Sequence, residues 1–203
     1  MSGDHDHSSD DVHHDTVLSR QVRAFETLLA DRGVVSSVEI DSLLEVIERA
    51  TPANGSHIAA RAWLDGSFAE RLLADANTAI TELGLTMGEG PDVRRLRVVA
   101  NTPQVHNVLV CTLCSCYPVS LLGPSPTWYK SEAYRSRIVR EPVQVLAEFG
   151  LTLPAGTEIV VWDSSALTRY MVLPQRPPDS DDATEQELAS LVTRNGLIGT
   201  AAL

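Results

Sequence analysis

The sequence has only three cysteines and far fewer basic than acidic residues. Its 203 residues include 16 Lys and Arg against 27 Asp and Glu, which gives a formal net charge of -11. Proteins that bind nucleic acid usually carry the opposite charge, so we expect no nucleic-acid partner. The acidic surface favours solubility and says little about the fold. A hydrophobic content of 43% is enough for a domain with a core of its own.

The chain also lacks a long apolar run. No segment is long enough to cross a bilayer, so we expect no membrane association. The first residues, MSGDHDHSSDDVHHD, contain no apolar stretch typical of a secretory signal, and we therefore predict a cytoplasmic protein. The odd number of cysteines disfavours a disulfide framework, and Cys114 and Cys116 are too close in sequence for relaxed disulfide geometry.

Composition and apolar spacing divide the chain into three predicted segments. Residues 1–15 are predicted to be a disordered polar tail. Residues 16–55 are predicted to be a helical N-terminal arm, with helices at 16–31 and 37–50 and with Asp15 as the first N-cap. The apolar stripes of these two helices need a partner surface, either the rest of this chain or another subunit.

Residues 56–203 are predicted to form a mixed α/β body, so the fold class is α+β with the helical arm attached to that body. Two helices are expected within 56–83, broken at Asp65-Gly66 and with Ser67 capping the second. Ser125 is expected to cap a helix that begins at Pro126. The remaining predicted elements are strands at 94–101, 105–111, 157–164 and 168–175, and helices at 127–137, 142–149 and 184–194.

All three cysteines, Cys111, Cys114 and Cys116, lie in a C-x-x-C-x-C loop at the end of a predicted strand. Three thiolates can converge on one metal ion. Structural zinc and iron–sulfur sites usually require four ligands, so the count favours an ion that takes further ligands from elsewhere. The amide nitrogens of Ser115 and Cys116, if deprotonated, would give five donors and leave one octahedral position open for a substrate.

Two non-catalytic alternatives stay open for these cysteines. One is a zinc module that serves assembly only, and the other is a thiol redox switch between Cys111 and Cys114. Several neighbouring residues are predicted to have structural roles. We expect His106 to be a hydrogen-bonded strand residue and not a ligand, and Asp163 to end a strand in a turn. Packing roles are expected for Trp128, Tyr129 and Tyr134. Arg135, Arg137 and Arg140 could reach the metal-binding loop or a partner subunit, but pairing with the acidic surface is the favoured role.

Several segments together resemble the α subunit of nitrile hydratase across residues 15–203. They include VCTLCSCYP, LLGPSPTWYKSEAYRSRIVREPVQVLAEFGL and VWDSSALTRYMVLPQRP. The resemblance implies that 56–203 is a catalytic metal-binding domain that hydrates a nitrile to an amide. In that family a threonine after the first cysteine marks the cobalt type, so Thr112 implies one non-corrinoid Co³⁺ per chain.

The resemblance also implies a role for each residue of the loop. Cys111 would be the axial thiolate, Cys114 a sulfinic acid and Cys116 a sulfenic acid, with the amide nitrogens of Ser115 and Cys116 completing the metal ligands. Cys114 and Cys116 would be the catalytic residues. Arginines of a β subunit, made of one or two chains, would bond the oxidised sulfurs in an αβ or (αβ)₂ assembly. An activator protein would insert the cobalt.

One position departs from the family pattern. Members commonly have tryptophan and proline after the Tyr-Pro that follows the cysteines, whereas this chain has Val119 and Ser120. The smaller side chain implies a wider pocket and a bulkier or more polar substrate, such as a bulky heteroaromatic nitrile. The alternative for this position is a neutral change that the β subunit compensates. The metal-bearing subunit of thiocyanate hydrolase, which carries the same C-T-L-C-S-C loop, is the alternative.

Overall fold

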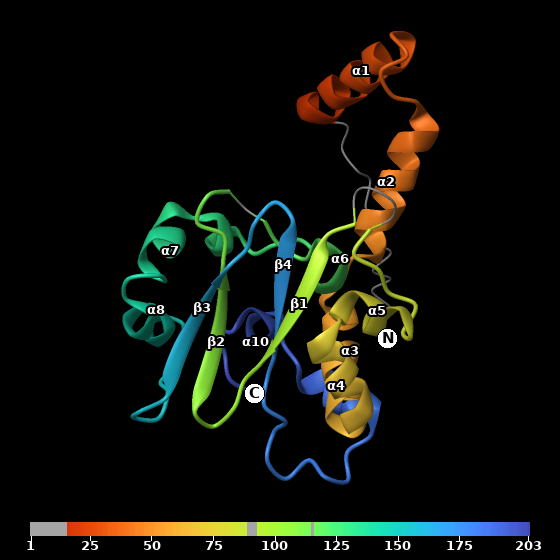
Figure 1. Ribbon diagram of the computed structural model, residues 1–203. Helices are drawn as coiled ribbons and strands as arrows, with labels where there is room; N and C mark the ends of the chain where they lie inside the picture. The colour runs from red at the N-terminus through yellow and green to blue at the C-terminus, as the bar shows by residue number, and fades with distance from the viewer. Residues whose placement is uncertain (1–15, 89–92, 115) are drawn as a thin grey trace, which may run out of the picture. The chain divides into compact units, whose positions relative to one another are not determined.

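The computed structural model describes residues 16–88, 93–114 and 116–203 (Figure 1). The chain forms two compact units, of which the first ends at Glu45 and the second comprises Val46–Leu203. None of the helices in the described parts of the chain has the length and apolar character of a membrane span. The predicted tail 1–15 lies outside the described residues.

The two helices predicted for the N-terminal arm are present as α1 (Val17–Asp31) and α2 (Ser37–Arg49). The N-cap of α1 is Thr16, whose hydroxyl accepts a hydrogen bond from the Ser19 amide at 3.1 Å, so the expected Asp15 cap is wrong. No side chain of α1 is buried. Its exposed apolar residues are Val17, Leu18, Val22, Phe25 and Leu28.

Three helices, not two, occupy the region around 56–83: α3 (Pro52–Leu64), α4 (Gly66–Ala74) and α5 (Ala76–Thr81). The break at Asp65-Gly66 is confirmed, but Asp65 caps α4 in place of Ser67 because its carboxylate accepts from the Phe68 amide at 3.0 Å. Asp75 caps α5 in the same way, by accepting from Thr78 at 3.3 Å, and this creates the extra helix boundary.

Helix α3 begins before the predicted boundary between arm and body. Thr51 caps it, and Pro52 occupies its first turn. Gly55 is buried so closely that an added Cβ would lie 2.7 Å from side chains of Leu122 and Leu197. The Ser56 hydroxyl donates to the Val192 carbonyl at 3.0 Å. These contacts make α3 part of the body, so the two units divide after Glu45 and not after residue 55.

All four predicted strands are confirmed, and they form two parallel pairs. β1 (Arg95–Ala100) pairs with β4 (Thr168–Leu173), and β2 (Val105–Val110) pairs with β3 (Glu158–Asp163). The two pairs lie side by side through β2 and β4 (Figure 1). Because β2 and β3 are parallel, Val110 is opposite Asp163, and both strands end at the same edge.

Short helices follow the strands. The predicted helix 127–137 is divided into η2 (Thr127–Lys130) and α7 (Glu132–Arg137), because Ser131 is extended and caps α7. Pro126, and not the expected Ser125, precedes η2. Helix α8 (Pro142–Glu148) is close to the prediction. The last predicted helix, 184–194, is present as α9 (Glu185–Leu191), whereas α6 (Val119–Leu122) and α10 (Arg194–Ile198) were not predicted.

The C-terminal turn after α10 is locked against β2. Gly199 has φ of 90°, and an added Cβ would overlap the Asn107 carbonyl oxygen. The buried His106 ring bonds through Nε2 to the Gly199 carbonyl at 2.7 Å and through Nδ1 to the Asn101 amide at 3.3 Å. Burial lowers the pKa of His106, so the neutral ring is favoured. The expected structural role of His106 is confirmed.

We predict that Gly199→Ala lowers the free energy of unfolding by about 2–4 kcal/mol, because left-handed backbone strain adds to steric overlap with β2. Gly156→Ala is the matched control, since Gly156 has φ of 88° but nothing within 4 Å of an added Cβ. Urea unfolding of both variants measures the difference. Equal losses of stability would show that the contact with β2 is unimportant.

Candidate metal centre

The three cysteines lie together where the chain leaves β2. Cys111 is the first residue after the strand and is buried, whereas Cys114 is exposed and Cys116 half-buried. Cys111 Sγ lies 3.3 Å from Cys114 Sγ, which lies 3.2 Å from Cys116 Sγ, and no disulfide joins them. All three sulfurs are within 4.8 Å of one another, so they can bind one ion.

The turn from Cys111 to Cys114 is closed by the chain itself. The Cys114 amide donates to Cys111 Sγ at 3.4 Å, which folds the C-x-x-C segment back on its first sulfur. Within the described residues, no His, Asp or Glu joins the three cysteines as a fourth side-chain ligand. Ser115, whose amide is predicted to be a ligand, lies outside those residues, so that role stays a prediction.

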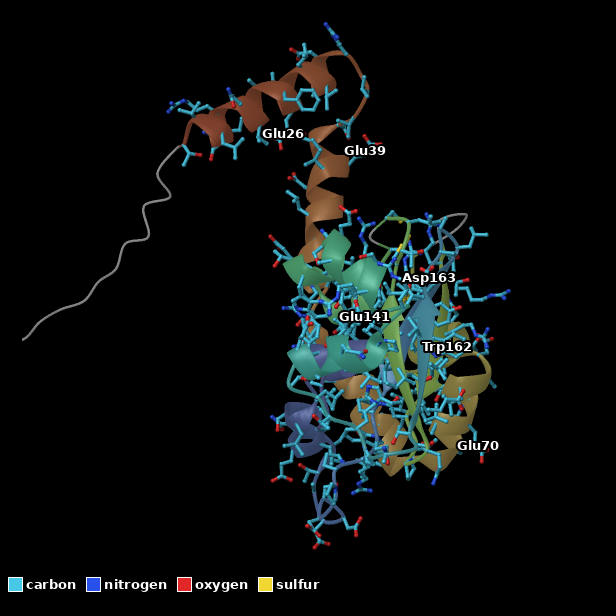
Figure 2. The ribbon with its side chains drawn as sticks, turned by 90° about the vertical axis from the view of Figure 1, so that its left-hand side faces the viewer. Glu26, Glu39, Glu70, Glu141, Trp162 and Asp163 are labelled. Atoms are coloured by element: carbon cyan, nitrogen blue, oxygen red, sulfur yellow. The ribbon has the colours of Figure 1, made fainter. Side chains whose placement is uncertain are left out.

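Asp163, the last residue of β3, holds the beginning of the loop. Its carboxylate accepts two hydrogen bonds from Thr112, one from the amide at 3.0 Å and one from the hydroxyl at 2.6 Å. Figure 2 shows Asp163 beyond Trp162 at the end of the strand. Sequence reasoning assigned Asp163 only a turn. Asp163 and the cysteine loop both stand at the end of a predicted strand. If these strands pair in parallel, their ends meet at one edge of the sheet, and this is the signal that could have identified Asp163.

Arg135 and Tyr129 hold the loop from a second side. The Arg135 guanidinium donates through Nη1 to the carbonyl oxygens of Thr112 at 3.3 Å and Cys114 at 3.2 Å. The expectation that Arg135 pairs with surface acids is therefore wrong. The Tyr129 hydroxyl donates to the Cys116 carbonyl at 3.1 Å. The loop is thus fixed by side chains from β3, α7 and η2.

The aromatic residues near the loop form a packed cluster, as predicted. The ring of Trp128 lies edge-on to Tyr134 and Phe149, with centroids 4.9 and 4.6 Å away. The Tyr134 hydroxyl donates to the Leu109 carbonyl at 2.6 Å, near the end of β2. This packing supports the segment that carries Tyr129 and Arg135, because buried aromatic pairs of this geometry add stability beyond area burial.

The sulfur group favours a bound cation. Burial, together with the hydrogen bond with Cys114, raises the pKa of Cys116 to about 11. The free thiol would therefore be protonated at neutral pH, whereas a nearby metal cation stabilises the thiolate. Three close sulfurs suit a soft or borderline transition-metal ion. The residues present fit such an ion.

Residues 16–201 match the family model for the nitrile hydratase alpha chain. With this fold and this sulfur group, the chain belongs to the nitrile hydratase alpha-chain family.

Among individual proteins, it is 49% identical to the low-molecular weight cobalt-containing nitrile hydratase subunit alpha of Rhodococcus rhodochrous, over 91% of this chain and 88% of that protein. It is 46% identical to the cobalt-containing nitrile hydratase subunit alpha of Pseudonocardia thermophila, over 90% and 89%. A solved structure of recombinant thiocyanate hydrolase comprising partially-modified cobalt centers aligns with a TM-score of 0.85 and 39% identity, covering 92% of this chain and 89% of that one.

We predict that Asp163→Asn weakens metal binding by roughly ten- to hundredfold, because an amide oxygen cannot replace both carboxylate acceptors of Thr112. Titration of the reduced full-length chain with Cd²⁺, followed by thiolate-to-metal absorption, measures the affinity. Glu158→Gln is the control, since Glu158 lies at the other end of β3. Wild-type affinity in Asp163→Asn would contradict the assigned role of Asp163.

Proposed function

We propose that this chain is the catalytic alpha subunit of a cobalt-dependent nitrile hydratase, which adds water to a nitrile to form an amide. The convergence of three sulfurs within 4.8 Å in the C-T-L-C-S-C loop is the observation that carries the proposal. Membership of the family and 46–49% identity to cobalt-containing relatives support it.

In this proposal one Co³⁺ is held by the sulfurs of Cys111, Cys114 and Cys116 and by the amide nitrogens of Ser115 and Cys116. The bound ion supplies Lewis acidity, which makes the nitrile carbon more electrophilic. Cys114 is a sulfinic acid and Cys116 a sulfenic acid, both partial steps on the cysteine oxidation ladder. The buried Cys111 stays a thiolate, because solvent and oxidants reach it least.

Cys116 is then the residue that works directly on the substrate. The oxygen of its sulfenate, or a water molecule that it activates, attacks the nitrile carbon. A proton is transferred to the nitrile nitrogen, and the resulting imidate tautomerises to the amide. If the sulfenate oxygen attacks, a water oxygen replaces it on sulfur. Either route adds one water to one nitrile. The Cys116 sulfenate is therefore regenerated at the end of each cycle.

The exposed part of the site implies a partner subunit. Cys114 is exposed, and Leu113 beside it is 89% exposed, so the loop offers an uncovered surface. We propose that a β subunit of one or two chains covers it in an αβ or (αβ)₂ assembly, with arginines that bond the oxidised sulfurs. The exposed apolar face of α1 offers a second surface for that subunit. An activator protein inserts cobalt in the cytoplasm.

Thiocyanate hydrolysis is the second candidate, because the structural match to a thiocyanate hydrolase with cobalt centers has a TM-score of 0.85. The same metal centre would serve either substrate. Metal content therefore does not separate the two activities, whereas their products do: an amide from a nitrile, or carbonyl sulfide from thiocyanate.

We predict that the chain, co-expressed with its partner subunit and activator in cobalt-containing medium, contains one cobalt and three added oxygens, two on Cys114 and one on Cys116. Metal analysis and mass spectrometry of the cysteine peptide measure both. The same preparation should form amides from nitriles. Active protein with zinc and unoxidised thiols would contradict the proposed centre, and carbonyl sulfide as the only product would favour the second candidate.

The substrate is proposed to be a bulky, heteroaromatic nitrile. Val119 begins α6 three positions after Cys116 and is 39% exposed, where the family pattern commonly has tryptophan. We predict that the wild-type complex prefers 3-cyanopyridine to acrylonitrile and that Val119→Trp lowers this preference by about tenfold, since a single pocket contact changes selectivity modestly. Competition assays measure the ratio, with Val143→Trp on the exposed face of α8 as the control. A wild-type preference for acrylonitrile would contradict the prediction.

A further inference from the structure

Arg135 contacts the metal-binding loop without contacting the sulfurs. Its Nη1 donates to the carbonyl oxygens of Thr112 and Cys114, at 3.3 and 3.2 Å. Thr112 lies within the turn that brings Cys111 and Cys114 together, and Cys114 ends it. One guanidinium therefore bridges two carbonyls of the turn and restricts its backbone.

One further donor of the Arg135 side chain is unsatisfied. Its Nε is buried and has no hydrogen-bond partner among the described residues. A buried, unpaired donor on a charged group is costly, and such a group in a folded protein calls for an explanation. Ion pairing with surface carboxylates does not explain the position of Arg135.

Arg137, on the same helix, shows what ordinary pairing looks like. Its guanidinium binds the carboxylate of Glu141 at 2.7 Å and that of Glu148 at 2.6 Å. Within the described parts of the chain, Arg135 has no such carboxylate partner and bonds to backbone oxygens of the loop. Helix α7 thus carries one arginine toward the acidic surface and another toward the cysteines.

The geometry of the peptide bond gives this contact a consequence. The Cys114 carbonyl belongs to the peptide whose nitrogen is that of Ser115, a proposed ligand. A peptide unit is planar, so a hydrogen bond to the Cys114 carbonyl oxygen restrains the peptide unit that leads into the proposed ligands. The positive charge of Arg135 also lies beside a loop that becomes strongly anionic when its thiols bind metal as thiolates.

We propose that Arg135 is a positioning residue of the metal centre: it bridges the Thr112 and Cys114 carbonyls, holds the loop in its metal-binding conformation and offsets the negative charge of its ligands. The inference rests on one part of the proposed function, namely that the loop binds a metal ion. It assigns Arg135 no contact with the substrate.

The test compares Arg135→Met, Arg135→Lys and the control Arg137→Met, each in the full-length chain co-expressed with its partner subunit. Cobalt per chain and the thiolate-to-metal absorption spectrum are measured, and the reduced chain is titrated with Cd²⁺. We expect Arg135→Met to lower cobalt content and Cd²⁺ affinity at least tenfold. Arg135→Lys should recover part of the affinity, because it restores the charge but not the two-carbonyl bridge. Arg137→Met should equal the wild type.

Wild-type cobalt content, spectrum and Cd²⁺ affinity in Arg135→Met would overturn the proposal. If Arg135→Met does not fold, Arg135→Lys is the deciding variant. A lysine variant identical to the wild type in all three readouts overturns the proposal. Reduced Cd²⁺ affinity with an altered spectrum supports it. Failure of the proposed function can be distinguished from failure of the Arg135 proposal. The wild type would then hydrolyse thiocyanate in place of nitriles, or would contain no cobalt. The Cd²⁺ comparison between the variants would still be valid in either case.

Discussion

The parallel pairing of β2 with β3 is the constraint on which the metal-binding loop depends. It places Val110 opposite Asp163, so the residue that ends β3 lies where the cysteine loop begins. The Asp163 carboxylate can then accept both hydrogen bonds from Thr112. The buried Cys111 is anchored by the strand itself, and the turn that follows has a fixed origin. A loop of this length would otherwise have many conformations, and ordering them costs entropy that these contacts offset.

The burial of the three sulfurs changes along the loop, and this gradient suits an active site shared between subunits. Cys111 is buried in the chain, Cys116 is half-buried, and Cys114 is exposed. Arg135 and Tyr129 hold the loop through its backbone oxygens, and Cys114 stays exposed. In the proposed function, this chain would supply the metal-binding half of the site and a β subunit would cover it.

Local patterns in the sequence were sufficient for most elements. Segments rich in β-branched residues located the strands, and apolar spacing located α1 and α2. The cysteine spacing alone identified a loop able to bind one ion. Helix ends were less predictable, because Asp65 and Ser67 are both good caps and only the folded backbone selects Asp65. Helix α6 was hidden among prolines that favour a loop.

The residues that support the site could not be found from local patterns. Asp163 lies 51 positions from Thr112, and Arg135 lies 23 positions from it. Their roles depend on which strands pair and on which way α7 is turned, and neither is encoded within a few residues of the cysteines. Arg135 and Arg137 are chemically identical and two positions apart on one helix, yet one contacts the loop and the other contacts acidic side chains.

X-ray absorption at the cobalt edge of the purified complex tests the central claim most directly, because it reports the neighbours of the ion itself. The account predicts a trivalent ion with three sulfur neighbours and two nitrogen neighbours, and a further position occupied by solvent or substrate. A four-coordinate ion, or one without nitrogen neighbours, in a fully active complex would contradict it.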